Sequence, residues 1–190
     1  MSDCCTPKGY RTIFSEKSAE AEARRYRRQG LDKLSRRIAE LLKERGVEGR
    51  TMLEVGGGVG AIEIELLKAG VTHAVNVELT PTYEEAAGEL LRETGLADRV
   101  ERRVMDFVET GAEVEAADFV VLNRVICCYP DMPRLAGAAA QHARARPGTD
   151  LSKRPLVDSS RVDGGQLWIP PLPGPIPGLH AFAEAHPGYC

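Results

Sequence analysis

Residues 52–60, MLEVGGGVG, place a carboxylate and four glycines at the end of an apolar segment. Glycine lets a backbone approach a ligand closely and adopt positive φ, and the start of a following helix offers free N–H groups with partial positive charge. Gly56, Gly57, Gly58 and Gly60 therefore predict a ligand-binding loop where a strand turns into a helix. The alternative is a tight turn without a ligand.

The glycine spacing leaves the ligand open. Gly56, Gly58 and Ala61 satisfy the dinucleotide pattern G-x-G-x-x-[GA], and Gly56, Gly58 and Gly60 satisfy G-x-G-x-G. Glu54 helps to decide, because a carboxylate would repel a pyrophosphate but suits a ligand that carries a cation, such as the ammonium group of an amino acid. We therefore expect a cationic group near Glu54.

Three further positions lie at the ends of predicted strands. Glu78, 20 residues after Gly58, can accept hydrogen bonds from both hydroxyls of a ribose. Asp106 can accept from an adenine amino group, and Phe107 can stack on the base. Asn123 ends the fourth strand, beneath the amino-acid part of such a ligand. Each also has a plain structural explanation, as an exposed acid or a locally satisfied amide.

The elements that must position these residues alternate between strand and helix. Apolar, β-branched runs predict strands, and amphipathic runs with capping residues predict helices. Strands alternating with helices imply right-handed βαβ units and a parallel, Rossmann-like sheet in an α/β fold. The predicted strands are 51–55, 73–79, 99–107 and 117–128, and the predicted helices are 61–70, 80–95 and 131–146.

Composition divides the chain of 190 residues into three parts. Residues 1–47 form an N-terminal helical cap, in which Gly30 separates two charged helices. Residues 48–146 form the Rossmann-like core. Residues 147–190 hold 8 of the 12 prolines and are expected to form an irregular tail, because proline removes the donors that a central strand needs.

Charge and cysteine usage exclude several classes of function. A net charge of −3 gives no reason to expect a nucleic-acid partner, and no apolar run is long enough to span a membrane. We therefore expect a cytoplasmic protein with a small-molecule substrate. The cysteines include two adjacent pairs and no C-x-x-C, so we expect reduced thiols and no metal site.

Together these motifs resemble those of the class I S-adenosylmethionine-dependent methyltransferases. The resemblance covers residues 48–146 and rests on LEVGGGVG, VNVEL, MDF and FVVLNRVICCYPD in this order. It implies a Rossmann-like fold, S-adenosyl-L-methionine as the cofactor and SN2 methyl transfer. It also implies that Glu54 and residues 56–60 hold the methionine part of the cofactor, that Glu78 binds the ribose, and that Asp106 and Phe107 bind the adenine.

The resemblance leaves the methyl acceptor open. The N-terminal helices of such enzymes commonly form a lid, which here contains Tyr26 within the basic run EARRYRRQG. Arg124 and Tyr129 lie where an acceptor would enter. These three residues could orient a substrate, or they could belong to a solvated helix face and a closed loop.

The tail conflicts with the usual sheet of seven strands, because a fifth strand should follow the helix that ends near Arg146. We hypothesise that a frameshift near Arg146 replaced the native C-terminal third, which would leave the chain inactive and the fourth strand as an apolar edge. The alternatives to a methyltransferase are an NAD(P)-dependent oxidoreductase and a non-catalytic nucleotide-binding remnant. Glu54 and the lack of a Tyr-x-x-x-Lys pair argue against the oxidoreductase.

Overall fold

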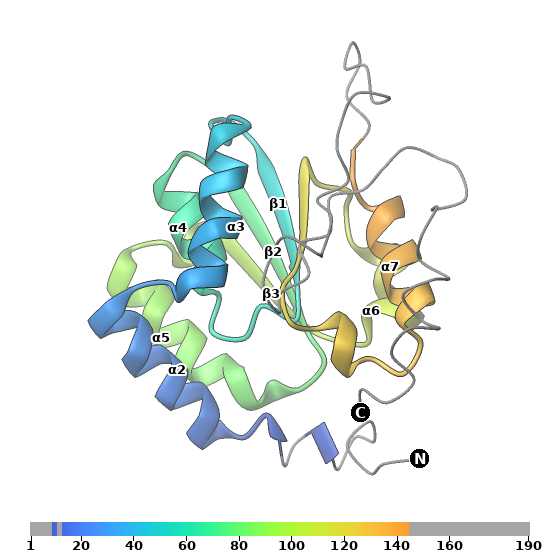
Figure 1. Cartoon of the computed structure of the whole chain (residues 1–190), viewed down its shortest axis with the longest axis horizontal. Coiled ribbons are helices and arrows are strands. Elements are labelled where there is room, and N and C mark those ends of the chain that lie inside the picture. Colours follow the sequence, from blue (N-terminus) through green and yellow to red (C-terminus); the bar gives the residue numbers. More distant parts are fainter. Residues whose placement is uncertain (1–8, 11–12, 145–190) are drawn as a thin grey trace.

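The computed structural model describes residues 9–10 and 13–144. Four strands alternate with helices, and Figure 1 shows helices on both faces of the sheet. No helix in these ranges is long and apolar enough to cross a membrane. The strands are β1 (Thr51–Val55), β2 (His73–Glu78), β3 (Val100–Val104) and β4 (Phe119–Leu122). The main helices are α2 (Glu16–Gln29), α3 (Lys33–Glu44), α4 (Ala61–Lys68), α5 (Glu84–Thr94), α6 (Phe107–Thr110) and α7 (Met132–Gln141).

The sheet is parallel in the order β3-β2-β1-β4, as the alternation of strands and helices predicted. Helices α2 to α5 cover one face, and α6 and α7 cover the other (Figure 1). Each face has its own apolar cluster, because successive side chains of a strand point to opposite faces. Met52 belongs to the first cluster, whereas Leu53 and Val55 belong to the second.

The same alternation places a row of polar residues on the face that α4 covers. Glu54 is paired in register with Asn76 on β2, and Asn76 is paired in turn with Arg102 on β3. Glu63 of α4 packs on this row and accepts a hydrogen bond of 2.9 Å from the Asn76 amide. The row ends at Arg102 on the edge strand β3. Charged side chains are therefore buried between the sheet and helices α4 and α5.

The N-terminal cap forms two helices, as expected. Ser15 caps α2 by accepting from the Ser18 N–H, and Asp32 caps α3 through two backbone N–H groups. Gly30 ends α2 with a φ of 69°, a value that the absence of a Cβ permits. Gly30 therefore separates the two helices as predicted, and this helix end lets α3 pack on α4 while α2 packs on α5.

Two local expectations were wrong. The third strand was expected to run to Phe107, but β3 ends at Val104, and Asp106 is the N-cap of the short helix α6. The Asp106 carboxylate accepts from two backbone N–H groups, which favours a helix start over an extended strand. The fourth strand was expected at residues 117–128 with Asn123 at its end, but β4 spans Phe119–Leu122, and Ile126–Cys128 form a 3₁₀ turn.

A fifth backbone segment begins beside β4. Ala117, just before β4, forms an isolated parallel bridge with Ala143, just after α7. The Ala117 N–H donates to His142 and the Arg144 N–H donates to Ala117, both at 2.8 Å. The predictions for residues 147–190, including the frameshift, lie outside the described residues.

Candidate functional site

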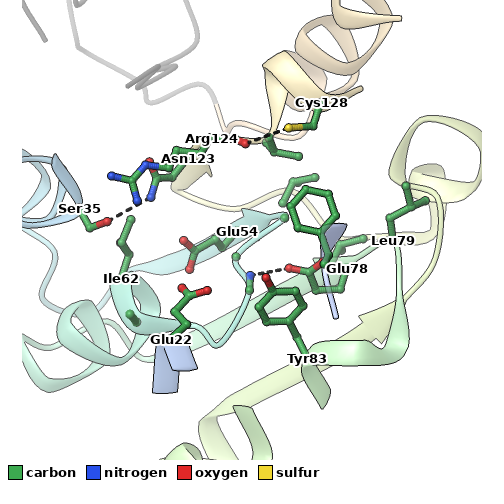
Figure 2. Close-up of a pocket in the computed structure, with 18 of the residues that line it drawn as sticks. Glu22, Ser35, Glu54, Ile62, Glu78, Leu79, Tyr83, Asn123, Arg124 and Cys128 are labelled. Carbon is green, nitrogen blue, oxygen red and sulfur yellow. Dashed lines mark hydrogen bonds between the residues drawn. The ribbon is translucent and has the colours of Figure 1, made fainter. Parts of the chain in front are cut away.

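A cavity of about 410 Å³ opens at the carboxyl ends of the strands, between the sheet and the N-terminal helices. Parallel sheets bind their ligands at this end. In Figure 2, Glu54 and Glu78 from the sheet and Glu22 from α2 all point into this space. The predicted residues that line it are Tyr26, Glu54, Gly56, Gly57, Gly58, Glu78, Phe107, Asn123, Arg124 and Tyr129, whereas Gly60 and Asp106 do not.

The glycine loop packs directly on the buried polar row. A Cβ added to Gly57 would lie 2.8 Å from the Glu54 carboxyl carbon and would overlap the Asn76 amide nitrogen. Gly60 begins α4 in the left-handed region, with φ 78°, and a Cβ there would overlap the Glu63 carboxylate. Gly60 therefore shapes the loop from beneath without lining the cavity.

Glu54 lies at the wall of the cavity with 1% of its surface exposed. Burial and the charge of Glu63 raise its pKa well above the usual range, although the Glu63 backbone N–H and Arg102 oppose this rise. Its Oε2 atom is buried and has no hydrogen-bond partner among the described residues. Because an unpaired buried acceptor is costly, this oxygen is suited to a donor on a bound ligand.

Glu78 ends β2 at the same cavity, 8% exposed. One carboxylate oxygen accepts a short hydrogen bond from the Gly58 N–H. Burial raises the pKa of Glu78 to about 7, while the Gly58 N–H and the Arg102 charge lower it. The position therefore provides a carboxylate whose ionisation is poised near neutral pH.

The residues that follow β3 are arranged differently from the prediction. Phe107 lines the cavity and is 4% exposed. Asp106 instead caps α6 and accepts a hydrogen bond of 2.9 Å from the Tyr129 hydroxyl. Both polar groups expected to meet a ligand here are thus bonded to each other, and Met105 is a further cavity residue that the sequence analysis did not single out.

The loop after β4 is tied to the start of α3. The Asn123 amide donates to the Ser35 hydroxyl at 3.2 Å (Figure 2). Arg124 donates two hydrogen bonds to the Asp32 carboxylate, at 3.1 and 3.2 Å. Arg124 has a φ of 60°, which is unfavourable for a residue with a Cβ. Burial raises the pKa of Asp32, but hydrogen bonds from Ser35 and the Arg124 charge outweigh it and lower that pKa to about 2.

Tyr26 contributes its ring to the cavity wall but not its hydroxyl. The hydroxyl donates to Glu65 at 2.7 Å and accepts from Lys68 at 3.1 Å. Burial and the Glu65 hydrogen bond raise the pKa of Tyr26 to about 12. Its polar group therefore joins α2 to α4 and faces away from an acceptor.

Sequence reasoning missed several polar residues of the site. Glu22 points into the cavity from α2, and burial raises its pKa. Asp32 and Ser35 hold the loop after β4, and Arg102 and Glu63 lie beneath the glycine loop. A signal for Asp32 was present, since an aspartate after a glycine and before an amphipathic run is typical of an N-cap. Helical spacing alone does not show which face of α2 meets the cavity.

No group of three or more His, Cys, Asp or Glu side chains within the described ranges is arranged to hold a metal ion. The Cys128 thiol donates a hydrogen bond to the Arg124 carbonyl oxygen, at 3.8 Å. Cys4, Cys5 and Cys190 lie outside those ranges.

A methyltransferase family model and several solved methyltransferase structures match this chain. A family model described as "Methyltransferase domain" matches residues 23–171, whereas no curated protein matches the chain. A protein from Galdieria sulphuraria, described as a sarcosine dimethylglycine methyltransferase, superposes with a TM-score of 0.54 at 21% identity over 59% of this chain and 43% of that one. An S-adenosyl-L-methionine-dependent methyltransferase described from Methanococcus maripaludis gives 0.53 at 22% identity over 68% and 57%.

An O-methyltransferase family protein from Burkholderia thailandensis also gives a TM-score of 0.53, at 25% identity, and covers 70% of this chain and 42% of that one. The chain thus aligns with between 42% and 57% of the lengths of these three proteins. The family model covers most of the chain, and the parallel four-stranded sheet agrees with the fold of these proteins. This chain therefore belongs to the methyltransferase domain family, with a Rossmann-like fold.

Proposed function

We propose that the chain binds S-adenosylmethionine in the cavity above β1 and β2 and transfers its methyl group to a small-molecule acceptor beneath α2. The observation that carries this proposal is that Glu54 lines the cavity beside a glycine loop while its buried Oε2 atom has no hydrogen-bond partner among the described residues. An ammonium group on the ligand would satisfy it. When bound, the cofactor supplies an electrophilic methyl group on a sulfonium sulfur.

The residues of the site fit each part of this cofactor. Glu54 would accept from the ammonium group, and the backbone of residues 56–58 would lie against the methionine part. Glu78 would accept from the ribose hydroxyls through the lone pairs that Gly58 leaves free. Phe107, together with Met105, would pack on the adenine. Asp106 is committed to α6 and Tyr129, so the contribution we propose for it is to orient Phe107.

The acceptor would occupy the side of the cavity that the N-terminal cap covers. Tyr10, Phe14 and Tyr26 line this side together with Glu22, and Tyr10 and Phe14 stack with their ring centroids 6.3 Å apart. Flat apolar groups pack well against such rings. The chain's own residues would align the acceptor and exclude water, which is a large part of what a transfer reaction needs.

Calorimetry with S-adenosylhomocysteine tests the cofactor assignment. We expect it to bind the wild-type chain, and Glu54→Gln to bind it about tenfold or more weakly, the scale of a charge-assisted hydrogen bond. NAD serves as the comparison ligand for the oxidoreductase alternative. Binding of NAD without binding of S-adenosylhomocysteine would contradict the proposal.

Turnover is a separate question from binding. The frameshift hypothesis rests on the proline-rich composition of residues 147–190 and on the fifth strand expected after Arg146, and it proposes that the native C-terminal third was replaced and that the chain is inactive. The family match runs to residue 171, beyond Arg146, which argues against the hypothesis. Sequencing the gene decides: if the reading frame continues through codon 190 in relatives without an insertion or deletion near codon 146, the hypothesis fails. We also propose that the protein is cytoplasmic, and this proposal rests on the sequence alone.

A further inference from the structure

Both backbone polar groups of Gly58 are held by charged side chains from neighbouring strands. Its N–H donates to the Glu78 carboxylate at the end of β2. Its carbonyl accepts a hydrogen bond of 3.0 Å from Nη2 of Arg102 on β3. One peptide of the glycine loop therefore lies between an acid and a base that are brought together only by the sheet.

Arg102 is itself fixed from several sides. It points to the face that α4 and α5 cover, and its side chain is 9% exposed. Its Nε and Nη2 atoms lie 3.1 and 2.9 Å from Glu84 Oε1, at the start of α5. Its Nη1 atom lies 3.6 Å from the buried Glu63 of α4. The planar guanidinium can make these contacts at once, which an ammonium cannot.

We propose that Arg102 is a positioning residue for the cofactor, which fixes the Gly58 peptide and thereby holds the Glu78 carboxylate at the wall of the cavity. This inference rests on the proposed function, because it assigns Arg102 a role in the same site. Arg102 does not line the cavity, so it acts through Gly58 and Glu78. An arginine that only formed salt bridges in the core would not also donate a hydrogen bond to the Gly58 carbonyl oxygen.

The positioning role predicts a specific change in the pKa of Glu78 when the charge of Arg102 is removed. The acidic groups that face Glu78 are Glu54 on β1, Glu63 on α4 and Glu84 on α5, with Tyr83 beside it. Arg102 supplies the positive charge that opposes them and lowers the pKa of Glu78. Loss of this charge would raise that pKa further, so Glu78 would be protonated, and a weaker acceptor, at a higher pH than in the wild type.

The test compares Arg102→Met and Arg102→Lys with Arg103→Met. Arg103 is the next residue on β3, points to the other face and pairs with the exposed Glu101. Calorimetry with S-adenosylhomocysteine at several pH values gives the dissociation constant, and thermal unfolding without ligand reports stability. We expect Arg102→Met to weaken binding about tenfold or more at pH 8 and to move the pH at which binding is half-lost upward. Arg103→Met should change neither the dissociation constant at pH 8 nor the pH at which binding is half-lost.

Arg102→Lys separates charge from geometry. It should keep the wild-type pH midpoint, because the charge remains, yet bind more weakly, because the fork to Gly58 and Glu84 is lost. The inference is overturned if the Arg102 variants lose thermal stability while their affinity and pH midpoint stay at wild-type values, or if Arg102→Met does not fold and Arg102→Lys binds as the wild type does. A wild-type chain that binds no S-adenosylhomocysteine would instead refute the proposed function.

Discussion

Glu63 of helix α4 and Asn76 of strand β2 share a hydrogen bond of 2.9 Å, and neither side chain has any exposed surface. Asn76 is in register with Glu54, and the glycine loop covers all three. The glycine loop of this chain therefore rests on polar and ionisable groups instead of on an apolar core. Its shape and its charge state are consequently linked.

The space beneath Gly57 predicts that even a methyl group is not tolerated there. Gly57→Ala would place a Cβ 2.8 Å from the Glu54 carboxyl carbon, and such overpacking costs about 1–3 kcal/mol. Urea unfolding should show this loss, and S-adenosylhomocysteine should bind more weakly. Gly137→Ala, on α7, is the control, because its Cβ would meet nothing within 4 Å and should stabilise the helix by up to about 1 kcal/mol. Equal stabilities of the two variants would argue against close packing of the loop.

Without ligand, the chain should be more stable in mild acid than in mild base. Burial raises the pKa of both Glu63 and Glu78 to about 7 in the folded chain, above their usual value in an unfolded chain. The folded state therefore binds protons more tightly, and the stability that these groups contribute is lost as the pH rises through about 7. Glu63→Gln should flatten the slope of the unfolding free energy between about pH 5 and pH 8. An unchanged slope would show that Glu63 does not titrate there.

Cofactor binding should depend on pH in the opposite sense. A protonated Glu78 is a weaker acceptor for ribose hydroxyls, so S-adenosylhomocysteine affinity should fall as the pH drops below the Glu78 pKa of about 7. Glu78→Gln should weaken binding by about 1–3 kcal/mol at high pH and reduce its pH dependence. Glu101→Gln, an exposed acid on β3, is the matched control and should bind as the wild type does.

Asp32 has two roles that a comparison with Asp131 can separate. Each caps a helix, α3 or α7, and substitution of either by Ala should lower stability by about 0.5–2 kcal/mol. Asp32 also bonds Arg124 at the cavity, so Asp32→Ala alone should release the loop after β4. Faster hydrogen exchange at Arg124 and Val125 in Asp32→Ala, but not in Asp131→Ala, would establish this link, and identical exchange would contradict it.

The Tyr26 hydroxyl should matter for stability and not for binding. Tyr26→Phe removes the hydrogen bonds to Glu65 and Lys68 and should cost about 1 kcal/mol of stability, while the ring at the cavity wall remains. Calorimetry should give wild-type affinity for S-adenosylhomocysteine. Weaker binding would mean that the hydroxyl turns toward the cavity when the ligand binds.

Local patterns were sufficient to predict the architecture. The β-branched run predicted as a strand at residues 117–128 contains β4, although β4 spans only Phe119–Leu122. The amphipathic helices correspond to elements of the structure. The position of Glu78 at a strand end also followed from its spacing after the glycines. The end of β3 did not follow from the sequence. Asp106 acts as a helix cap because it accepts from two backbone N–H groups, and these become available only in the folded turn.

The sequence by itself therefore determined the parallel sheet, the glycine loop and the position of Glu78 at a strand end, since these depend on periodicity, on backbone freedom and on spacing along one chain. Only the tertiary structure decided which polar groups remain available to a ligand. In the folded chain Tyr129 bonds Asp106 and the Tyr26 hydroxyl bonds Glu65, whereas Glu54 Oε2 has no hydrogen-bond partner among the described residues. The tertiary structure also brings Arg102 to Gly58. Such pairings depend on strand register and helix packing, which join residues far apart in the chain and leave no local signal.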